Sequence, residues 1–206
     1  MILAHEPRIT VVGEAGDGVE AVDAARRLTP DVVLMDIRMP RLDGIEATRQ
    51  ITSHSDGPAV LVLTTFDFDE YVYRALRAGA SGFLLKDAPE EQLVTSVLAA
   101  AGSVTFTPAV AARMATRFGP TAAQAADRYP PLGRLTARER DVLVELAAGR
   151  SNGEIARRLF LGENTVKSHV ASLLTKLDLH SRTQAVIVAY ESGLVNNSDG
   201  RLPGAR

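Results

Sequence analysis

Asp36, Thr64 and Lys86 each stand at the end of an apolar run that is typical of a buried strand. Because the carboxyl ends of parallel strands meet at one edge of a sheet, we expect a carboxylate, a hydroxyl and an ammonium in one crevice. This trio suits phosphoryl transfer to a carboxylate, with Asp36 as nucleophile and the other two residues binding the phosphoryl oxygens. A divalent cation would normally be needed, because nucleophile and donor are both anionic.

The elements that must position these residues alternate between apolar runs and helical patterns. Near-continuous apolar strands joined by helices indicate a parallel sheet covered on both faces, so residues 1–108 are predicted to form an α/β domain. The predicted strands are 9–12, 31–36, 59–64 and 82–85, and the predicted helices are 18–28, 44–51, 69–78 and 89–101.

Three segments of this half carry a family resemblance: "VVLMDIRMPRLDG", "VLVLTTFDFDEY" and "RAGASGFLLKDAP". Together they resemble the receiver domain of bacterial two-component response regulators, which has a flavodoxin-like fold. The resemblance implies that Asp36 is the phospho-acceptor and Thr64 the switch hydroxyl, with Thr65 as the competing hydroxyl. It further implies that Phe83 is the switch aromatic, that Lys86 senses the phosphate and that Mg²⁺ is the cofactor.

One part of the receiver pattern is not found, so the domain looks N-terminally incomplete. Receivers of this family begin with a strand that ends in two acidic residues, and these hold the magnesium ion. Residues 1–18 instead look like the tail of the first helix followed directly by the second strand. Asp36 and the backbone carbonyl of Arg38 remain as metal ligands, which are too few for firm Mg²⁺ binding.

Other acidic residues are poor replacements for that pair. Among Glu6, Glu14 and Asp17, the last two follow the second strand on the correct rim of the sheet, but one strand too far away, and a solvated loop is expected there. Two explanations stay open: an incomplete chain, or a natural regulator that has abandoned phosphorylation. The intact Asp36 and its three companions favour the first, with phosphorylation of this chain impaired.

The second half is predicted to be all helical, in a four-helix domain over 134–195. Thr136 with Glu139, and Ser151 with Glu154, make capping boxes that open the first two helices. The predicted helices are 136–148, 151–159, 163–177 and 182–192. Residues 135–194, "LTARERDVLVELAAGRSNGEIARRLFLGENTVKSHVASLLTKLDLHSRTQAVIVAYESGL", resemble the LuxR-type helix-turn-helix domain that accompanies receivers in the NarL/FixJ group.

The resemblance implies that 163–177 is the recognition helix and 152–159 its supporting helix. Lys167 is the favoured base or phosphate contact, Thr165 and Ser168 are shorter-range partners, and His169 either contributes or packs. The outward positions are Asn164, Thr165, Lys167, Ser168, Ala171 and Ser172. Phosphate contacts, or simply solvated charges, are offered by Arg138, Arg150, Arg157, Arg158 and Lys176.

By resemblance, the last helix supplies a dimer face through Val186, Ala189 and Tyr190. The alternative is that these residues belong to the domain's own core, and the two roles are compatible. One such domain makes few DNA contacts, so we expect a homodimer on double-stranded DNA with two half-sites. Between the domains, 109–133 is predicted to be a partly helical linker that ends in a stiff, extended segment at Pro130–Pro131. Residues 196–206 are predicted to be a flexible tail.

Composition and charge fit this organisation. Residues 1–108 hold nine Lys and Arg against 16 Asp and Glu, whereas 109–206 hold 14 against nine, so the second half suits an anionic polymer. The chain has no Cys and no apolar run of the roughly 18 residues that a membrane span needs, and we expect a cytoplasmic protein.

The sequence therefore predicts a DNA-binding transcriptional response regulator that a sensor histidine kinase controls by phosphorylating Asp36. The alternative is a phosphorylation-independent DNA-binding regulator whose degenerate receiver serves for dimerisation. An enzyme is not expected, because no glycine-rich phosphate loop follows an early strand and no Ser-His or metal-ligand cluster is found.

Overall fold

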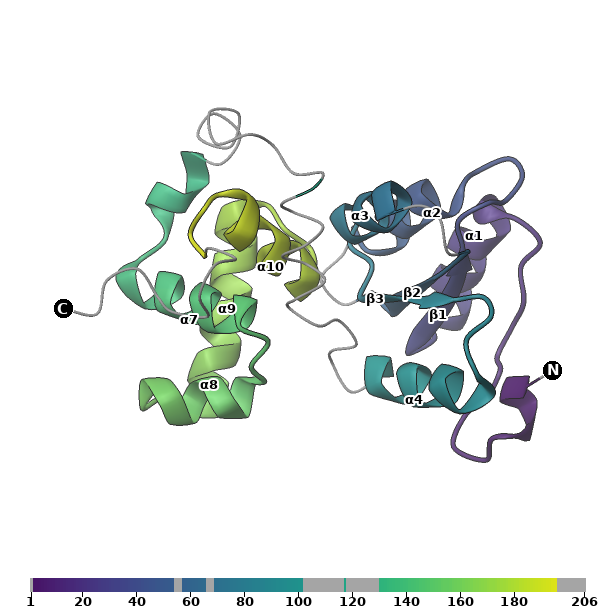
Figure 1. The fold of residues 1–206 in the computed structure, drawn as a ribbon, viewed down its shortest axis with the longest axis horizontal. Coiled ribbons are helices and arrows are strands. Elements are labelled where there is room, and N and C mark those ends of the chain that lie inside the picture. The colour runs from purple at the N-terminus through teal and green to yellow at the C-terminus, as the bar shows by residue number, and fades with distance from the viewer. Residues whose placement is uncertain (1, 54–56, 66–68, 102–116, 118–129, 196–206) are drawn as a thin grey trace. The chain divides into compact units, whose positions relative to one another are not determined.

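The computed structural model describes residues 2–53, 57–65, 69–101, 117 and 130–195 (Figure 1). The chain divides into two compact units, residues 1–105 and 106–206. The predicted tail, 196–206, lies outside the described residues, and so does most of the predicted linker, 109–133. Along the described part of the chain, no helix is both long enough and apolar enough to cross a membrane.

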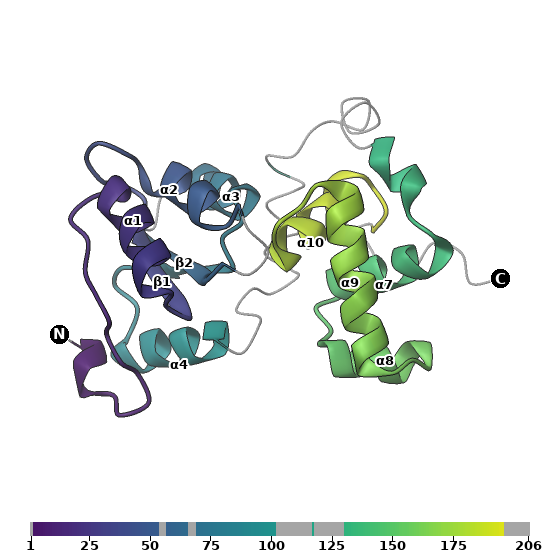
Figure 2. The same ribbon diagram turned by 180° about the vertical axis from the view of Figure 1, so that it is seen from behind.

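The first unit contains a parallel sheet in the order β1-β2-β3, the three strands found among its described residues. Helices α1, α2 and α3 lie on one face of this sheet and α4 on the other (Figures 1 and 2). All predicted helices of this unit, and three of its four predicted strands, are confirmed to within one residue. The elements are η1 (Ile2–His5), α1 (Gly18–Leu28), β1 (Val32–Asp36), α2 (Gly44–Ile51), β2 (Ala59–Thr64), α3 (Asp69–Arg77), β3 (Gly82–Leu85) and α4 (Glu90–Ala101).

The prediction of a strand over 9–12 is wrong. These residues adopt no regular structure, and the side chains of Val11 and Val12 are 38% and 52% exposed. β-branched residues favour a strand only where a neighbouring strand completes the hydrogen-bond ladder. Among the described residues β1 pairs with β2 alone, so the segment 9–12 has no such neighbour.

The core of the first unit follows from the central position of β2. Val60, Leu61 and Val62 are fully buried, because successive side chains point to opposite faces and both faces are covered. Leu61 lies in one buried apolar cluster with Leu84 of β3 and with Val97 and Ala100 of α4.

Helix α2 begins directly against the strand that ends in Asp36. Asp43 caps the helix by accepting the amide of Glu46, and the amide of Gly44 donates to the carbonyl of Ile37. A Cβ atom at Gly44 would clash with the carbonyl oxygen of Asp36, so this close approach requires glycine. The loop behind Asp36 is consequently fixed at both ends.

The second unit is all helical, as predicted. Three of its helices open with capping boxes, including the two predicted at Thr136 and Ser151. Their apolar faces form a core that contains Val142, Leu143, Leu146, Ile155, Val166 and Leu173. The elements are η2 (Pro130–Arg134), α7 (Ala137–Ala147), α8 (Asn152–Leu159), α9 (Glu163–Leu177) and α10 (Arg182–Glu191).

The prediction of an extended segment at Pro130–Pro131 is wrong, because these residues begin the 3₁₀ helix η2. Proline fixes φ near −65°, a value that polyproline and 3₁₀ conformations share, so consecutive prolines do not decide between them. Contacts with other elements decide here. The side chain of Arg140 on α7 donates to the carbonyl of Leu132, and η2 packs against α9.

Candidate functional site

Asp36 and Lys86 meet at the carboxyl rim of the sheet. The ammonium nitrogen of Lys86 lies 2.6 Å from Oδ2 of Asp36, and the amide of Arg38 donates to Oδ1 at 3.2 Å. The backbone amide of Lys86 donates to the carbonyl of Thr64, which ties the three predicted strand ends together. Both ionic side chains are partly exposed, 35% for Asp36 and 42% for Lys86, so the carboxylate is accessible from solvent.

Thr64 and Phe83 occupy the two strands that follow β1. Thr64 is buried, and its hydroxyl donates to the carbonyl of Thr65 at 3.2 Å, while Thr65 itself is exposed. Phe83 is half-buried on β3, opposite Val62. The structure thus brings Asp36 and Lys86 into contact and places Thr64 on the strand between them.

The described residues do not assemble a magnesium site. No cluster of three or more His, Asp or Glu side chains that could hold a metal occurs in the described part of the chain. Asp36 offers one carboxylate, which already accepts from Lys86, and the Arg38 carbonyl could add one oxygen ligand. Glu6 is paired with Arg8. This set is too small for firm Mg²⁺ binding.

Asp17 does not lie in a solvated loop, contrary to the prediction. It is buried, caps α1 by accepting the amides of Val19 and Glu20, and pairs with the guanidinium of Arg41. Burial alone would raise the pKa of Asp17, but the Glu20 amide and the guanidinium together hold it below its usual value. Asp17 is therefore committed to structure.

Sequence reasoning missed Arg41, which joins the loop after Asp36 to the start of α1. Its guanidinium contacts Asp17 and lies 2.9 Å from Oε1 of Glu20. Its backbone is left-handed, with φ at 63°. No spacing rule connects positions 17 and 41, so no sequence signal could have found this contact.

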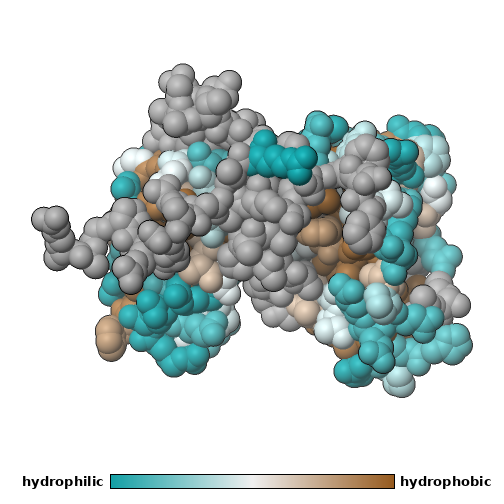
Figure 3. All heavy atoms as spheres, viewed as in Figure 1, coloured by the Kyte–Doolittle hydropathy of each residue, from teal (hydrophilic) through white to brown (hydrophobic). Residues whose placement is uncertain are grey.

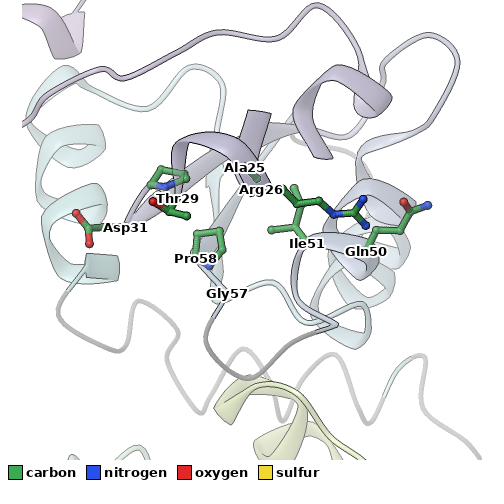
Figure 4. A pocket seen from close by; sticks show the side chains of 9 residues that line it. Ala25, Arg26, Thr29, Asp31, Gln50, Ile51, Gly57 and Pro58 are labelled. Atoms are coloured by element: carbon green, nitrogen blue, oxygen red, sulfur yellow. The ribbon is translucent and has the colours of Figure 1, made fainter. Parts of the chain in front are cut away.

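A cavity of about 600 Å³ in the first unit lies away from the acidic site (Figure 4). It opens at the amino ends of β1 and β2, beside the carboxyl ends of α1 and α2, whereas Asp36 and Lys86 lie at the opposite rim of the sheet. Its lining is Ala25, Arg26, Thr29, Pro30, Asp31, Gln50, Ile51, Gly57 and Pro58. It takes no part in the arrangement around Asp36.

In the second unit, α9 presents the side chains that were predicted to contact DNA. Thr165, Lys167 and Ser168 are exposed, and His169 is half-buried. Ser172 does not face outward as predicted: it is half-buried, and its hydroxyl donates to Oε1 of Glu139 at 2.7 Å. The polar surface of α9 is therefore concentrated in its first half. The visible surface over α8, beside it, is mainly hydrophilic (Figure 3).

Glu139 binds polar side chains from the C-terminal half of α9, which are therefore not available for DNA. Its carboxylate is buried in the first turn of α7 and accepts from the ammonium of Lys176 at 2.7 and 2.8 Å. The hydrogen bonds from Lys176 and Ser172 lower the pKa of Glu139 to about 2. Lys176, a predicted phosphate contact, is thus engaged inside the unit.

Most of the other predicted phosphate contacts also have internal partners. Arg150 and Arg158 both pair with the buried carboxylate of Glu145, at 2.6 and 3.1 Å. Arg138 donates to the carbonyl of Leu159. Arg157 differs, because it is exposed and has no hydrogen bond or ion pair with any described residue.

The residues predicted for a dimer face serve the fold of the second unit. Val186 and Ala189 are buried in α10, which packs mainly on α7. The hydroxyl of Tyr190 donates to the carbonyl of Ala147 at 3.1 Å. These contacts support the intradomain alternative for Tyr190, and the use of α10 in a dimer stays a prediction.

The fold and the sites define a class of protein: a parallel α/β unit with a carboxylate and an ammonium at its strand ends, joined in one chain to a helix-turn-helix unit. Comparison with known families agrees for both units. Residues 2–98 match the response regulator receiver domain, and residues 133–189 match the family of bacterial regulatory proteins of the luxR type. The first unit is therefore a receiver domain with a flavodoxin-like fold.

Relatives match over nearly the whole chain. The chain is 43% identical over 195 residues to the uncharacterized transcriptional regulatory protein YxjL of Bacillus subtilis, covering 94% of this chain and 89% of that protein. It is 40% identical to the transcriptional regulatory protein LiaR of the same organism, over 94% and 90%. Among solved structures, the chain resembles the crystal structure of the response regulator ChrA from a heme-sensing two-component system, with a TM-score of 0.46. The two sequences are 39% identical, and the match covers 94% of this chain and 90% of that one.

The chain belongs to the response regulators that join a receiver domain to a LuxR-type DNA-binding domain. It is a DNA-binding transcription regulator of the two-component type, and its relatives are regulators rather than enzymes.

Proposed function

We propose that this regulator is controlled through Asp36. The observation that carries the proposal is the contact of 2.6 Å between the Lys86 ammonium and the Asp36 carboxylate at an accessible strand end. An Asp36 oxygen attacks the phosphorus of the donor, the bond from phosphorus to the donor group breaks, and the phosphoryl group stays on Asp36. The Lys86 ammonium then neutralises one phosphoryl oxygen. The Thr64 hydroxyl turns away from the Thr65 carbonyl and donates to a second phosphoryl oxygen.

The natural donor in this proposal is a sensor histidine kinase. Mg²⁺ would be held by Asp36 and the Arg38 carbonyl together with water, and the small ligand set predicts weak binding. Because the regulator acts on chromosomal DNA, we place it in the cytoplasm.

Phosphorylation with a small phosphodonor tests the role of Asp36. Intact-mass analysis of the full chain, with and without Mg²⁺, should show only partial addition of one phosphoryl group, because the Mg²⁺ ligand set is small, and no addition to Asp36→Asn. Asp31→Asn is a matched control, because Asp31 precedes the same strand at its opposite end. Labelling of Asp36→Asn to the wild-type level would contradict the proposal.

A second candidate function is DNA binding that does not depend on phosphorylation. The lack of a metal-holding cluster in the described residues favours it. Under this alternative the phosphodonor leaves the affinity for DNA unchanged, and Asp36→Asn binds like the wild type. Under the main proposal the phosphodonor strengthens DNA binding of the wild type alone.

We further propose that α9 enters the major groove with its first half. Its exposed Thr165, Lys167 and Ser168 contact base edges or phosphates, and the half-buried His169 lies beside them. Two copies bind two half-sites as a dimer, which raises affinity through effective concentration. Gel shifts that give equal affinity for one half-site and for two would count against dimeric recognition.

A further inference from the structure

Phe160 is the most exposed large apolar side chain among the described residues. Its exposure is 93%, whereas Val11, Val12 and Val19 reach between 38% and 52%. Phe160 also ends α8 in a left-handed conformation, with φ at 55°, which is unfavourable for any residue with a Cβ atom. The left-handed conformation ends α8 just as it ends α1 at Thr29 and α9 at Asp178, and this role does not require an aromatic ring. Because the Phe160 ring is almost fully exposed, it gains little from burial in the unit and is available for a contact outside it.

The position of Phe160 in the chain connects it to the DNA-binding surface. It lies in the turn between α8 and α9, and two residues separate it from Glu163, where α9 begins. Figure 2 shows α9 starting beside α8. Lys167 follows it by seven residues on α9 and is an exposed cation without an ion pair to a described residue. Arg157 precedes it by three residues and is exposed, although part of its charge acts on the carboxylate of Glu154. The turn therefore precedes a helix whose exposed cation suits a polyanion.

We propose that Phe160 packs against duplex DNA at the rim of the major groove, with its ring on the 5-methyl group of a thymine and the neighbouring deoxyribose. The inference rests on the proposed entry of α9 into that groove. In helix-turn-helix proteins the start of the second helix contacts base edges while the first helix crosses the backbone, so the turn between them lies at the rim. Phenylalanine on a thymine methyl group is an established form of base readout.

The proposed packing has a signature that separates it from a phosphate contact. An apolar contact releases no counterions, so removing it lowers affinity without changing the dependence of affinity on salt. Removing a phosphate contact made by Lys167 would instead lower that slope by about one. The two kinds of contact can therefore be distinguished in one set of titrations.

The experiment uses the full chain and a duplex that the wild type enriches from a random-sequence library. Affinity is measured by fluorescence anisotropy at several salt concentrations for the wild type, Phe160→Ala and Phe160→Leu. We expect Phe160→Ala to bind about 5- to 10-fold more weakly with an unchanged salt slope, and Phe160→Leu to retain most of the affinity. Replacing thymine by uracil in the duplex should weaken the wild type about threefold and leave Phe160→Ala unaffected.

A folding defect is excluded with Phe160→Gly, which relieves the left-handed backbone and should unfold at the same temperature as the wild type or higher. Its DNA affinity should fall like that of Phe160→Ala. Wild-type affinity for Phe160→Ala would overturn the proposed packing while leaving the proposed function intact. Normal DNA binding without transcription by purified RNA polymerase would also overturn it, and would assign the ring to a protein partner. If the wild type enriched no duplex, the proposed function would fail and the packing of Phe160 on DNA with it.

Discussion

The ammonium of Lys86 lies 2.6 Å from the carboxylate of Asp36, although the two residues are 50 positions apart in the chain. The parallel pairing of β1 with β2 and of β2 with β3 brings them to one rim of the sheet. In the proposed function, the Lys86 ammonium moves from the carboxylate to a phosphoryl oxygen when a phosphoryl group is attached to Asp36.

Replacing Lys86 by Met should separate signalling from stability. Both partners of the ion pair are partly exposed, so its removal should lower the free energy of unfolding by less than about 1 kcal/mol. The phosphodonor should no longer change the affinity for DNA, because Lys86→Met leaves no ammonium at this position to bind a phosphoryl oxygen. Urea unfolding and gel shifts measure the two effects, with Arg26→Met as a surface control. A normal phosphodonor response in Lys86→Met would refute the role of the ammonium.

Replacing Lys176 by Met should destabilise the second unit. The buried carboxylate of Glu139 would keep its bond from Ser172 and its place in the capping box but lose its cation. An uncompensated buried charge of this kind costs about 1–3 kcal/mol in the free energy of unfolding. Arg157→Met is the matched control, since it removes an exposed cation without an ion pair to a described residue, and it should change stability by less than about 0.5 kcal/mol. Equal unfolding midpoints for the two variants would contradict this account.

The stability of the second unit should fall in acid through Glu139. Its pKa is about 2 in the folded chain, against an ordinary value of 4.5, so the folded state prefers the ionised form. The stabilisation is complete above pH 4.5 and is lost as the pH falls from 4.5 toward 2. Urea midpoints at several pH values should decline less steeply for Glu139→Gln than for the wild type in that window. Parallel declines would show that other carboxylates dominate.

The left-handed backbone of Arg41 makes glycine and alanine unequal replacements there. Both substitutions remove the guanidinium from Asp17 and Glu20 and should destabilise the first unit. Glycine adopts a φ of 63° without strain, so Arg41→Gly should be more stable than Arg41→Ala by about 1 kcal/mol. Thermal and urea unfolding of the pair measure the difference. Arg41→Ala at or above the stability of Arg41→Gly would contradict it.

Replacing Lys167 by Ala should weaken DNA binding in a salt-dependent way. If Lys167 neutralises one phosphate, the slope of log affinity against log salt falls by about one. A weaker affinity with an unchanged slope would instead indicate a contact to a base edge. Arg26→Ala, on the first unit, removes a charge of the same sign and should leave the slope unchanged.

The sequence by itself determined the features that depend on local periodicity and on one topological rule. Strands that end in Asp36 and Thr64 and a strand just before Lys86 were predictable because apolar runs alternate with helices, and because parallel strands bring their carboxyl ends together. The capping boxes at Thr136 and Ser151 were equally predictable, because their partners lie three residues away.

Only the tertiary structure decided the features that depend on distant partners. Residues 9–12 have strand propensity but form no strand, because a ladder needs a neighbour that the segment itself cannot supply. Asp17 with Arg41, and Glu139 with Lys176, are 24 and 37 residues apart, and no periodicity relates them. Those pairs determine which charges are committed to the fold and which, like Lys167, have no ion pair to a described residue. Local sequence sets which elements form, whereas burial and long-range pairing set which side chains can act.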